Sequence, residues 1–192
     1  MKTIGVLALQ GDVKEHCEAL ERIGARPTRV RRLSELDNVD ALVIPGGEST
    51  TMEKLLRAFS LFEPLQGHVQ SGMPVLGTCA GMVLLADDLV GGIEGQTTLG
   101  GLDVTVRRNA FGRQKDSAET TIVWTSDNRE ENATFIRAPW VERVGPGVEV
   151  LARVPAYEDQ VVAVRAGNVM AAAFHPELVE SDTLHVMLRD SA

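Results

Sequence analysis

A cysteine lies where two apolar runs meet, in the hexapeptide GTCAGM at residues 77–82. A strand that turns directly into a helix holds the residue at the turn in a strained conformation, and the small neighbours Gly77, Ala80 and Gly81 allow it. Such a turn would push the side chain of Cys79 toward solvent, with the first N–H groups of the helix facing the sulfur. These groups favour a thiolate and can hold an oxyanion. The pattern predicts a nucleophile at Cys79, and the alternative is a buried structural cysteine.

A thiolate needs a base, and His175 is the best candidate because it ends an apolar run and is followed by Pro176 and Glu177. Proline disfavours the helical conformation at the residue before it, so we expect an extended chain at His175. Residues two apart in an extended chain point to the same side, so Glu177 should reach the imidazole and orient it. The alternative is a solvated loop after a strand. We expect the other three histidines at the surface: His16, His68 and His185.

A third loop, PGGEST at residues 45–50, follows another apolar run. Its two glycines let the backbone approach a substrate closely, and N–H groups there could complete an oxyanion hole. Phosphate binding is the alternative, but the sequence has neither a Walker lysine nor a G-x-G-x-x-G motif.

The elements that position these loops alternate between strand and helix in the first 90 residues. Two helix starts have capping-box spacing, Asp12 with Glu15 and Thr50 with Glu53. A polar linker is expected between the helix at 51–58 and the strand at 73–77. The remaining strand predictions are 3–9, 26–32, 40–45, 119–125, 133–137, 148–154, 160–165 and 168–174. The glycine-rich stretch at 91–108 is β-like, and a weak helix is predicted at 181–189.

This alternation predicts an α/β fold of three layers, with a mostly parallel central sheet flanked by helices as in flavodoxin-like proteins. Ligands of such sheets bind outside the carboxyl ends of the strands, so the loops PGGEST, GTCAGM and FHPEL should meet at one edge. The length of 192 residues suits a single domain over residues 1–192.

Composition excludes several classes of protein. The net charge of −8 argues against nucleic acid as a partner, and no apolar run approaches the length of a membrane span. The two cysteines give neither a disulfide framework nor metal-ligand spacing, which fits a cytoplasmic protein. We expect Cys17 to be a small core residue of the first helix.

The chain resembles the class I (triad) glutamine amidotransferase family in the blocks GTCAGM, HPE and PGG. More narrowly, it resembles the glutaminase subunits of pyridoxal 5′-phosphate synthases from residue 4 to about residue 188. The blocks that carry this closer resemblance are LALQGDVKEH, IPGGESTTM, LGTCAGMVLLA, RRNAFGRQ, FIRAP and AAAFHPEL.

The resemblance implies that the protein hydrolyses L-glutamine to L-glutamate and ammonia, with neither cofactor nor metal. It assigns the nucleophile to Cys79, the base to His175 and the orienting acid to Glu177, with Gly47 and Ala80 as the oxyanion hole. An arginine suits the substrate α-carboxylate, because guanidinium pairs with carboxylate in a bidentate fork, but which arginine does so stays open. The alternative for Arg108, Arg113 and Arg137 is a solvated basic surface. The implied substrate-binding positions are Gly47, Glu48, Ser49, Arg108, Ile136 and Arg137.

The resemblance also implies a partner, a (β/α)₈-barrel synthase subunit that receives the ammonia in a hetero-oligomeric complex and makes pyridoxal 5′-phosphate. We expect Gln10 and the helix after it to contribute to the docking surface. Two alternatives remain. One is a non-catalytic interaction protein on the same fold, which the complete Cys79, His175 and Glu177 set disfavours. The other is a related cysteine hydrolase, in which a histidine would follow the nucleophile where this chain has Ala80.

Overall fold

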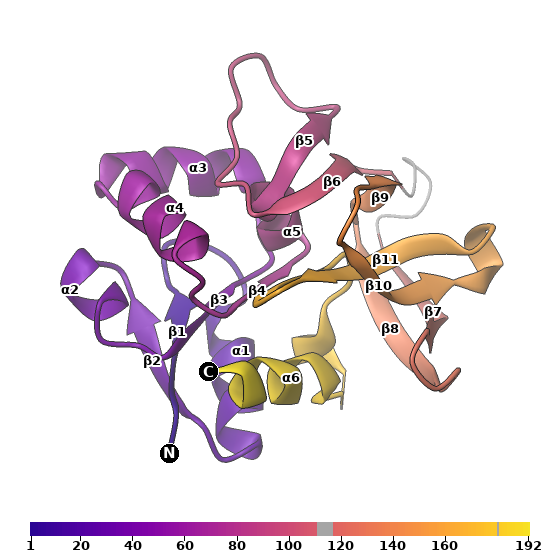
Figure 1. The fold of residues 1–192 in the computed structure, drawn as a ribbon, viewed down its shortest axis with the longest axis horizontal. Coiled ribbons are helices and arrows are strands. Elements are labelled where there is room, and N and C mark those ends of the chain that lie inside the picture. The colour runs from indigo at the N-terminus through magenta and orange to yellow at the C-terminus, as the bar shows by residue number, and fades with distance from the viewer. Residues whose placement is uncertain (111–116, 180) are drawn as a thin grey trace.

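The computed structural model describes residues 1–110, 117–179 and 181–192, and in this part of the chain the strands form two sheets (Figure 1). The strands are β1 (Thr3–Leu7), β2 (Arg26–Val30), β3 (Ala41–Ile44), β4 (Val75–Thr78), β5 (Ala86–Val90), β6 (Leu102–Arg107), β7 (Ser117–Trp124), β8 (Glu130–Ile136), β9 (Trp140–Val144), β10 (Glu149–Val154), β11 (Gln160–Ala166) and β12 (Val169–Ala172). The helices are α1 (Val13–Arg22), α2 (Leu33–Leu36), α3 (Ser49–Ala58), α4 (Phe62–Gln70), α5 (Ala80–Leu85) and α6 (Thr183–Ser191), with 3₁₀ turns at Pro155–Tyr157 and Pro176–Leu178.

The larger sheet is nine-stranded among the described residues, in the order β2-β1-β3-β4-β12-β11-β10-β7-β8. Its first part, from β2 to β12, pairs in parallel, and the strands beyond β12 continue antiparallel. The smaller sheet, three-stranded in the same described ranges, has the order β5-β6-β9. Because β3, β4 and β12 are parallel neighbours, the loops that follow them emerge at the same edge.

Helices cover both faces of the parallel part of the sheet, as Figure 1 shows. Helices α3, α4 and α5 lie on one face, and α1 and α6 lie on the other. Helix α5 packs on β4, and α6 packs against β3 and β4 from the opposite side. Every residue of β3, β4 and β12 is buried, as expected for strands covered on both faces. The predicted three-layer α/β architecture is confirmed.

Several local predictions were wrong. The stretch between α3 and β4 is helix α4 rather than a polar linker, because Phe62, Leu65 and Val69 form an apolar face that packs into the core. Strands β5 and β9 were not predicted. Their burial patterns lack a long apolar run, and they find partners only through β6 in the smaller sheet.

Neither predicted capping box forms. Thr50 lies inside α3, and the N-cap is Glu48, whose carboxylate accepts hydrogen bonds from the N–H groups of Thr50 and Thr51. Asp12 is the N-cap residue of α1, but its carboxylate makes no capping hydrogen bond and turns toward His175 instead. In the described part of the chain, no helix is long and apolar enough to cross a bilayer.

Candidate active site

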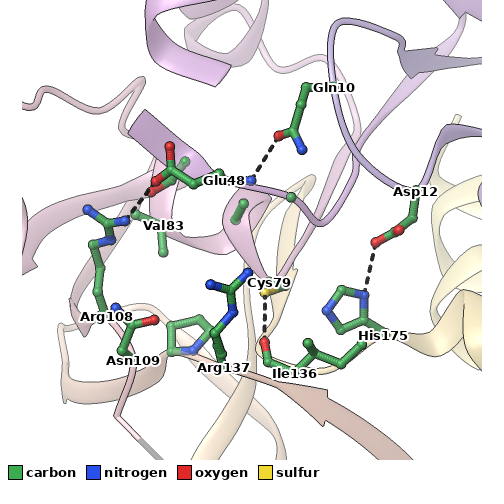
Figure 2. A pocket seen from close by; sticks show the side chains of 14 residues that line it. Gln10, Asp12, Glu48, Cys79, Val83, Arg108, Asn109, Ile136, Arg137 and His175 are labelled. Atoms are coloured by element: carbon green, nitrogen blue, oxygen red, sulfur yellow. Dashed lines mark hydrogen bonds and ion pairs between the residues drawn. The ribbon is translucent and has the colours of Figure 1, made fainter. Parts of the chain in front are cut away.

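The three predicted loops meet around one pocket of about 320 Å³ (Figure 2). Of the residues that the sequence singled out for catalysis or substrate binding, all but Glu177 line this pocket: Gly47, Glu48, Ser49, Cys79, Ala80, Arg108, Ile136, Arg137 and His175. Glu177 lies behind His175 and is buried. The arrangement follows from the parallel order of β3, β4 and β12, which brings the ends of these strands to a common edge.

Cys79 has the strained backbone that the turn from β4 to α5 requires, with φ 48° and ψ −102°. The turn is compact because Gly77 and Gly81 carry no side chain: a Cβ at Gly77 would lie 2.6 Å from the backbone of Gly81. Contrary to the expectation of a solvent-facing thiol, Cys79 is only 7% exposed. Its sulfur lies at the pocket wall, 3.8 Å from the carbonyl oxygen of Ile136, at the distance of a weak S–H contact.

His175 is oriented by two carboxylates. Its Nδ1 lies 2.8 Å from Glu177 Oε1 and 3.2 Å from Asp12 Oδ2, so this nitrogen carries a proton and Nε2 is the atom free for chemistry. Nε2 is buried and makes no hydrogen bond to any described residue. Burial lowers the pKa of His175, but Asp12, the Cys79 sulfur and Glu177 outweigh it and raise the pKa to about 12. The raised pKa favours the imidazolium, so a proton that passes from the thiol to this ring is held there.

The route by which Glu177 reaches the imidazole differs from the predicted one. The chain does not stay extended after His175 but enters the 3₁₀ turn at Pro176–Leu178, which proline starts readily. The contact between His175 and Glu177 is nevertheless formed. Burial raises the pKa of Glu177, and the hydrogen bond and charge of His175 partly offset that rise.

Glu48 organises the second side of the pocket. Its Oε1 lies 2.9 Å from Arg108 Nη2, and its own N–H donates to Gln10 Oε1 at 2.8 Å. Arg108 also donates to Gln96 Oε1 at 2.9 Å. Burial raises the pKa of Glu48, but the hydrogen bonds from Thr51 and Thr50 outweigh it and lower the pKa to about 2. Glu48 is therefore a carboxylate that fixes a guanidinium at the pocket wall.

The other pocket arginine, Arg137, follows β8 in the left-handed conformation, at φ 43°. The neighbouring pocket residue Asn109 is also left-handed, at φ 49°. Non-glycine residues in this region carry local strain, which concentrates at binding and catalytic sites. Arg137 and Cys79 line the same pocket, as Figure 2 shows. The remaining arginine of the basic motif, Arg113, lies outside the described residues.

Two of the histidines expected at the surface are buried. His16 on α1 and His185 on α6 are 0% exposed, and His16 contacts Glu177 and His185 instead of lining the pocket. His68 on α4 is partly exposed and pairs with Asp37 at 3.0 Å. The prediction was wrong for His16 because its helix turns that side chain inward with Ala19 and Leu20.

The pocket also contains residues that the sequence analysis did not assign to it. Gln10 was expected only at the docking surface and Asp12 only at a helix start, although both follow β1 and ligands bind at the carboxyl ends of parallel strands. The other three lie in blocks that carry the family resemblance but were given no role, and they approach from α5 and from the ends of β6 and β8: Val83, Asn109 and Pro139.

Metal ligands were not expected, and one group among the described residues has the spacing for them. Ligand-type atoms of Asp12, His175 and Glu177 all lie within 4.8 Å of one another. His175 Nδ1 already bonds to Glu177, so these atoms satisfy one another as an acid–base set. We therefore assign them to hydrogen bonding.

A family model and several curated proteins match most of this chain. The model of the SNO glutamine amidotransferase family matches residues 6–188. Pyridoxal 5′-phosphate synthase subunit PdxT of Acidothermus cellulolyticus is 60% identical over 185 residues, covering 95% of this chain and 89% of that protein. The same subunit of Mycolicibacterium smegmatis is 54% identical, with 98% and 97% covered.

Two solved structures have folds similar to that of this chain. A crystal structure of a glutamine amidotransferase superposes with a TM-score of 0.90 at 44% identity, covering 98% of this chain and 97% of that one. The structure of PurLQS from Thermotoga maritima contains a chain with a TM-score of 0.65 at 17% identity, with 100% and 97% covered, and that chain shows the same fold.

Proposed function

Because this chain belongs to the SNO glutamine amidotransferase family, we propose that it hydrolyses the side-chain amide of L-glutamine, giving L-glutamate and ammonia. The observation that carries the proposal is the joint placement of Cys79 and His175 at one pocket. The imidazole there is held by Glu177 at 2.8 Å through Nδ1, which leaves Nε2 for the thiol.

The reaction proceeds in two steps. His175 takes the thiol proton, and the sulfur attacks the amide carbon, forming a tetrahedral oxyanion. The C–N bond then breaks, the imidazolium gives its proton to the leaving nitrogen, and ammonia departs from a glutamyl thioester. Water, deprotonated by His175, attacks the thioester, and the S–C bond breaks to release glutamate and restore the thiol. We assign the oxyanion hole to Gly47 and Ala80, which line the same pocket as Cys79.

We assign substrate recognition to the arginines and loops of the pocket wall. Arg108, held by Glu48, and Arg137 are the cations of the pocket wall among the described residues, and either suits the α-carboxylate of glutamine. The remaining proposed substrate contacts are those of the glycine loop and the end of β8: Gly47, Glu48, Ser49 and Ile136.

A partner belongs to the proposal, because the relatives are named as subunits of pyridoxal 5′-phosphate synthase. We propose that the ammonia passes to a (β/α)₈-barrel synthase subunit in a hetero-oligomeric complex, where pyridoxal 5′-phosphate is made. A sealed path makes chemical sense, since free ammonia is mostly protonated at neutral pH. We place the complex in the cytoplasm, which suits a protein with two free cysteines.

The test is glutamate release from L-glutamine by the full chain, measured with and without the synthase subunit of the same organism. Cys79→Ala should lower the rate by more than roughly 1,000-fold, as loss of a nucleophile does in a triad enzyme. Cys17→Ala is the matched control, because Cys17 is half-buried on α1 and should leave the rate unchanged. The synthase subunit should raise the rate of the unaltered chain.

Two results would contradict this function. Binding of the synthase subunit without glutamate release under either condition would identify a non-catalytic interaction protein. Equal glutaminase activity of the Cys79→Ala and Cys17→Ala variants would contradict the assignment of Cys79 as the nucleophile.

A further inference from the structure

Two buried histidines continue the catalytic row on the side away from the pocket. His16 on α1 and His185 on α6 lie on the same face of the sheet, and His16 Nδ1 is 2.9 Å from His185 Nε2. The other nitrogen of His16, Nε2, lies 3.1 Å from Thr78 Oγ1 and 3.4 Å from Glu177 Oε2. Thr78 directly precedes the nucleophile, so His16 contacts the segment before Cys79 and the acid of the triad at once.

One proton arrangement suits these contacts best. If His185 Nε2 donates to His16 Nδ1, the proton of neutral His16 sits on Nε2, and this N–H donates to Thr78 Oγ1 with Glu177 Oε2 3.4 Å from the same nitrogen. The reverse arrangement would aim a lone pair of His16 at the Glu177 carboxylate. It would also put the proton of His185 on Nδ1, which is buried without a hydrogen-bond partner among the described residues. A buried unpaired donor is the costlier defect, so the first arrangement is favoured.

The second carboxylate oxygen of Glu177 lacks a hydrogen-bond donor that such an N–H could supply. Oε2 is buried and makes no hydrogen bond to the described residues, while Oε1 is engaged by His175. Charged carboxylates buried without donors are costly. His16 Nε2 lies 3.4 Å from this oxygen without forming a hydrogen bond to it, and catalytic contacts that are long or poorly aligned in the free enzyme often tighten when substrate binds.

We propose that His16 and His185 are positioning residues for the glutaminase reaction, with His185 fixing the tautomer of His16 so that its Nε2–H supports the Glu177 carboxylate. The inference rests on the proposed function, since it extends the row of Cys79, His175 and Glu177 by two rings. Groups that support a catalytic ligand or base from behind are commonly worth about 10- to 100-fold in activity.

The surrounding charges are consistent with neutral rings. Burial, followed by the charges of His185 and His175, lowers the pKa of His16 well below its usual value. Burial lowers the pKa of His185 to about 4, with Asp182 and Arg22 acting in opposite directions on it. The groups that act on Glu177 are His175 beside it, Asp12 from the loop before α1, and His16 from α1.

Imidazole ¹⁵N NMR on the unaltered full chain tests the proton arrangement directly. We expect both His16 and His185 to be neutral, with the proton on Nε2, between pH 6 and pH 8. A proton on Nδ1 of His16, or a charged ring at pH 7, overturns the proposal. This measurement requires neither a folded variant nor any activity, so it separates the proposal from the proposed function.

Variants test the positioning role. His16→Leu should lower kcat for glutamine hydrolysis by roughly 10-fold or more while leaving KM unchanged, because the support acts on the triad rather than on substrate binding. His16→Gln keeps an N–H near the position of Nε2 and should recover most of the lost kcat. His68→Leu is the matched control, because the partly exposed His68 on α4 contacts Asp37 far from the triad, and it should change neither constant.

The kcat values of the His16 variants either support or contradict the positioning role. Unchanged kcat in folded His16→Leu, or a His16→Gln variant no better than His16→Leu, overturns the positioning role. Loss of kcat in His16→Leu with rescue in His16→Gln supports it. If the tautomers are as expected but the unaltered chain releases no glutamate with its partner, the proposed function fails and the positioning role fails with it.

Discussion

At the scale of single residues, carboxylates hold the imidazole of His175 and the guanidinium of Arg108 in place. Asp12 and Glu177 share one nitrogen of His175, at 3.2 and 2.8 Å, and raise the pKa of that ring against the effect of burial. Glu48 has a double role, since it caps α3 through Thr50 and Thr51 and holds Arg108 with the same carboxylate. The pocket therefore has an acid–base side and a cationic side, each fixed by acidic residues.

The capping role of Glu48 predicts a pH-dependent stability. Its pKa falls from 4.5 to about 2 on folding, so its contribution is present above pH 4.5 and is lost as the pH falls from 4.5 toward 2. Glu48→Ala should lower the free energy of unfolding by about 1 kcal/mol at pH 7, the usual worth of an N-cap. Urea unfolding of both proteins from pH 7 down to pH 3 should show this difference shrinking.

The control for this series is Glu18→Ala, because Glu18 is exposed on α1 and pairs with the exposed Lys14. Its effect should stay within about 0.5 kcal/mol throughout, as for most surface pairs. A Glu48→Ala deficit that stays constant down to pH 3 would contradict the capping role.

At the scale of elements, the site depends on close contact between α5 and the strands beneath it. A Cβ placed on Gly81 would lie 2.2 Å from the carbonyl oxygen of Ile44 in β3, so α5 touches the sheet backbone directly. This contact brings the start of α5, and with it Cys79, against the loop after β3. The short apolar runs and glycines predicted this βα unit, whereas β5 and β9 depend on pairing across the smaller sheet and were missed.

A matched pair of glycine substitutions tests the contact. Gly81→Ala should destabilise the protein by about 1–3 kcal/mol, because either the helix or β3 must move. It should also lower glutaminase activity by displacing Cys79. Gly67→Ala in α4 meets nothing within 4 Å and should be neutral or stabilise by about 0.5–1 kcal/mol. Thermal unfolding measures both, and a Gly81→Ala protein as stable as Gly67→Ala would contradict the close packing.

At the scale of the whole molecule, one sheet joins the two ends of the chain. Strand β12 inserts beside β4, and the buried core runs continuously from Ile4 to Leu188. The proposed catalytic row depends on this closure, because His175 follows β12 while Cys79 follows β4. That the chain behaves as a single domain over residues 1–192 stays a prediction, which the continuous core supports.

Unfolding experiments test this prediction. A single cooperative unit should give the same denaturation midpoint by far-ultraviolet circular dichroism and by tryptophan fluorescence. The fluorescence reports on Trp124 in the large sheet and Trp140 in the small one. Two separated transitions would show that the antiparallel part unfolds independently.

The sequence by itself determined the chemistry-bearing residues and the alternation of elements, because a strained turn needs small neighbours and buried parallel strands need apolar runs. It could not determine that the carboxylate of Asp12, the N-cap residue of α1, contacts His175 instead of capping the helix. Nor could it determine that His16 and His185 meet behind Glu177. The contact between His16 and His185 joins positions 169 residues apart, and it exists because α1 and α6 pack on the same face of the sheet. Local patterns indicate that a helix has an apolar face, but only the packing of distant elements decides which polar side chains are enclosed there and what they meet.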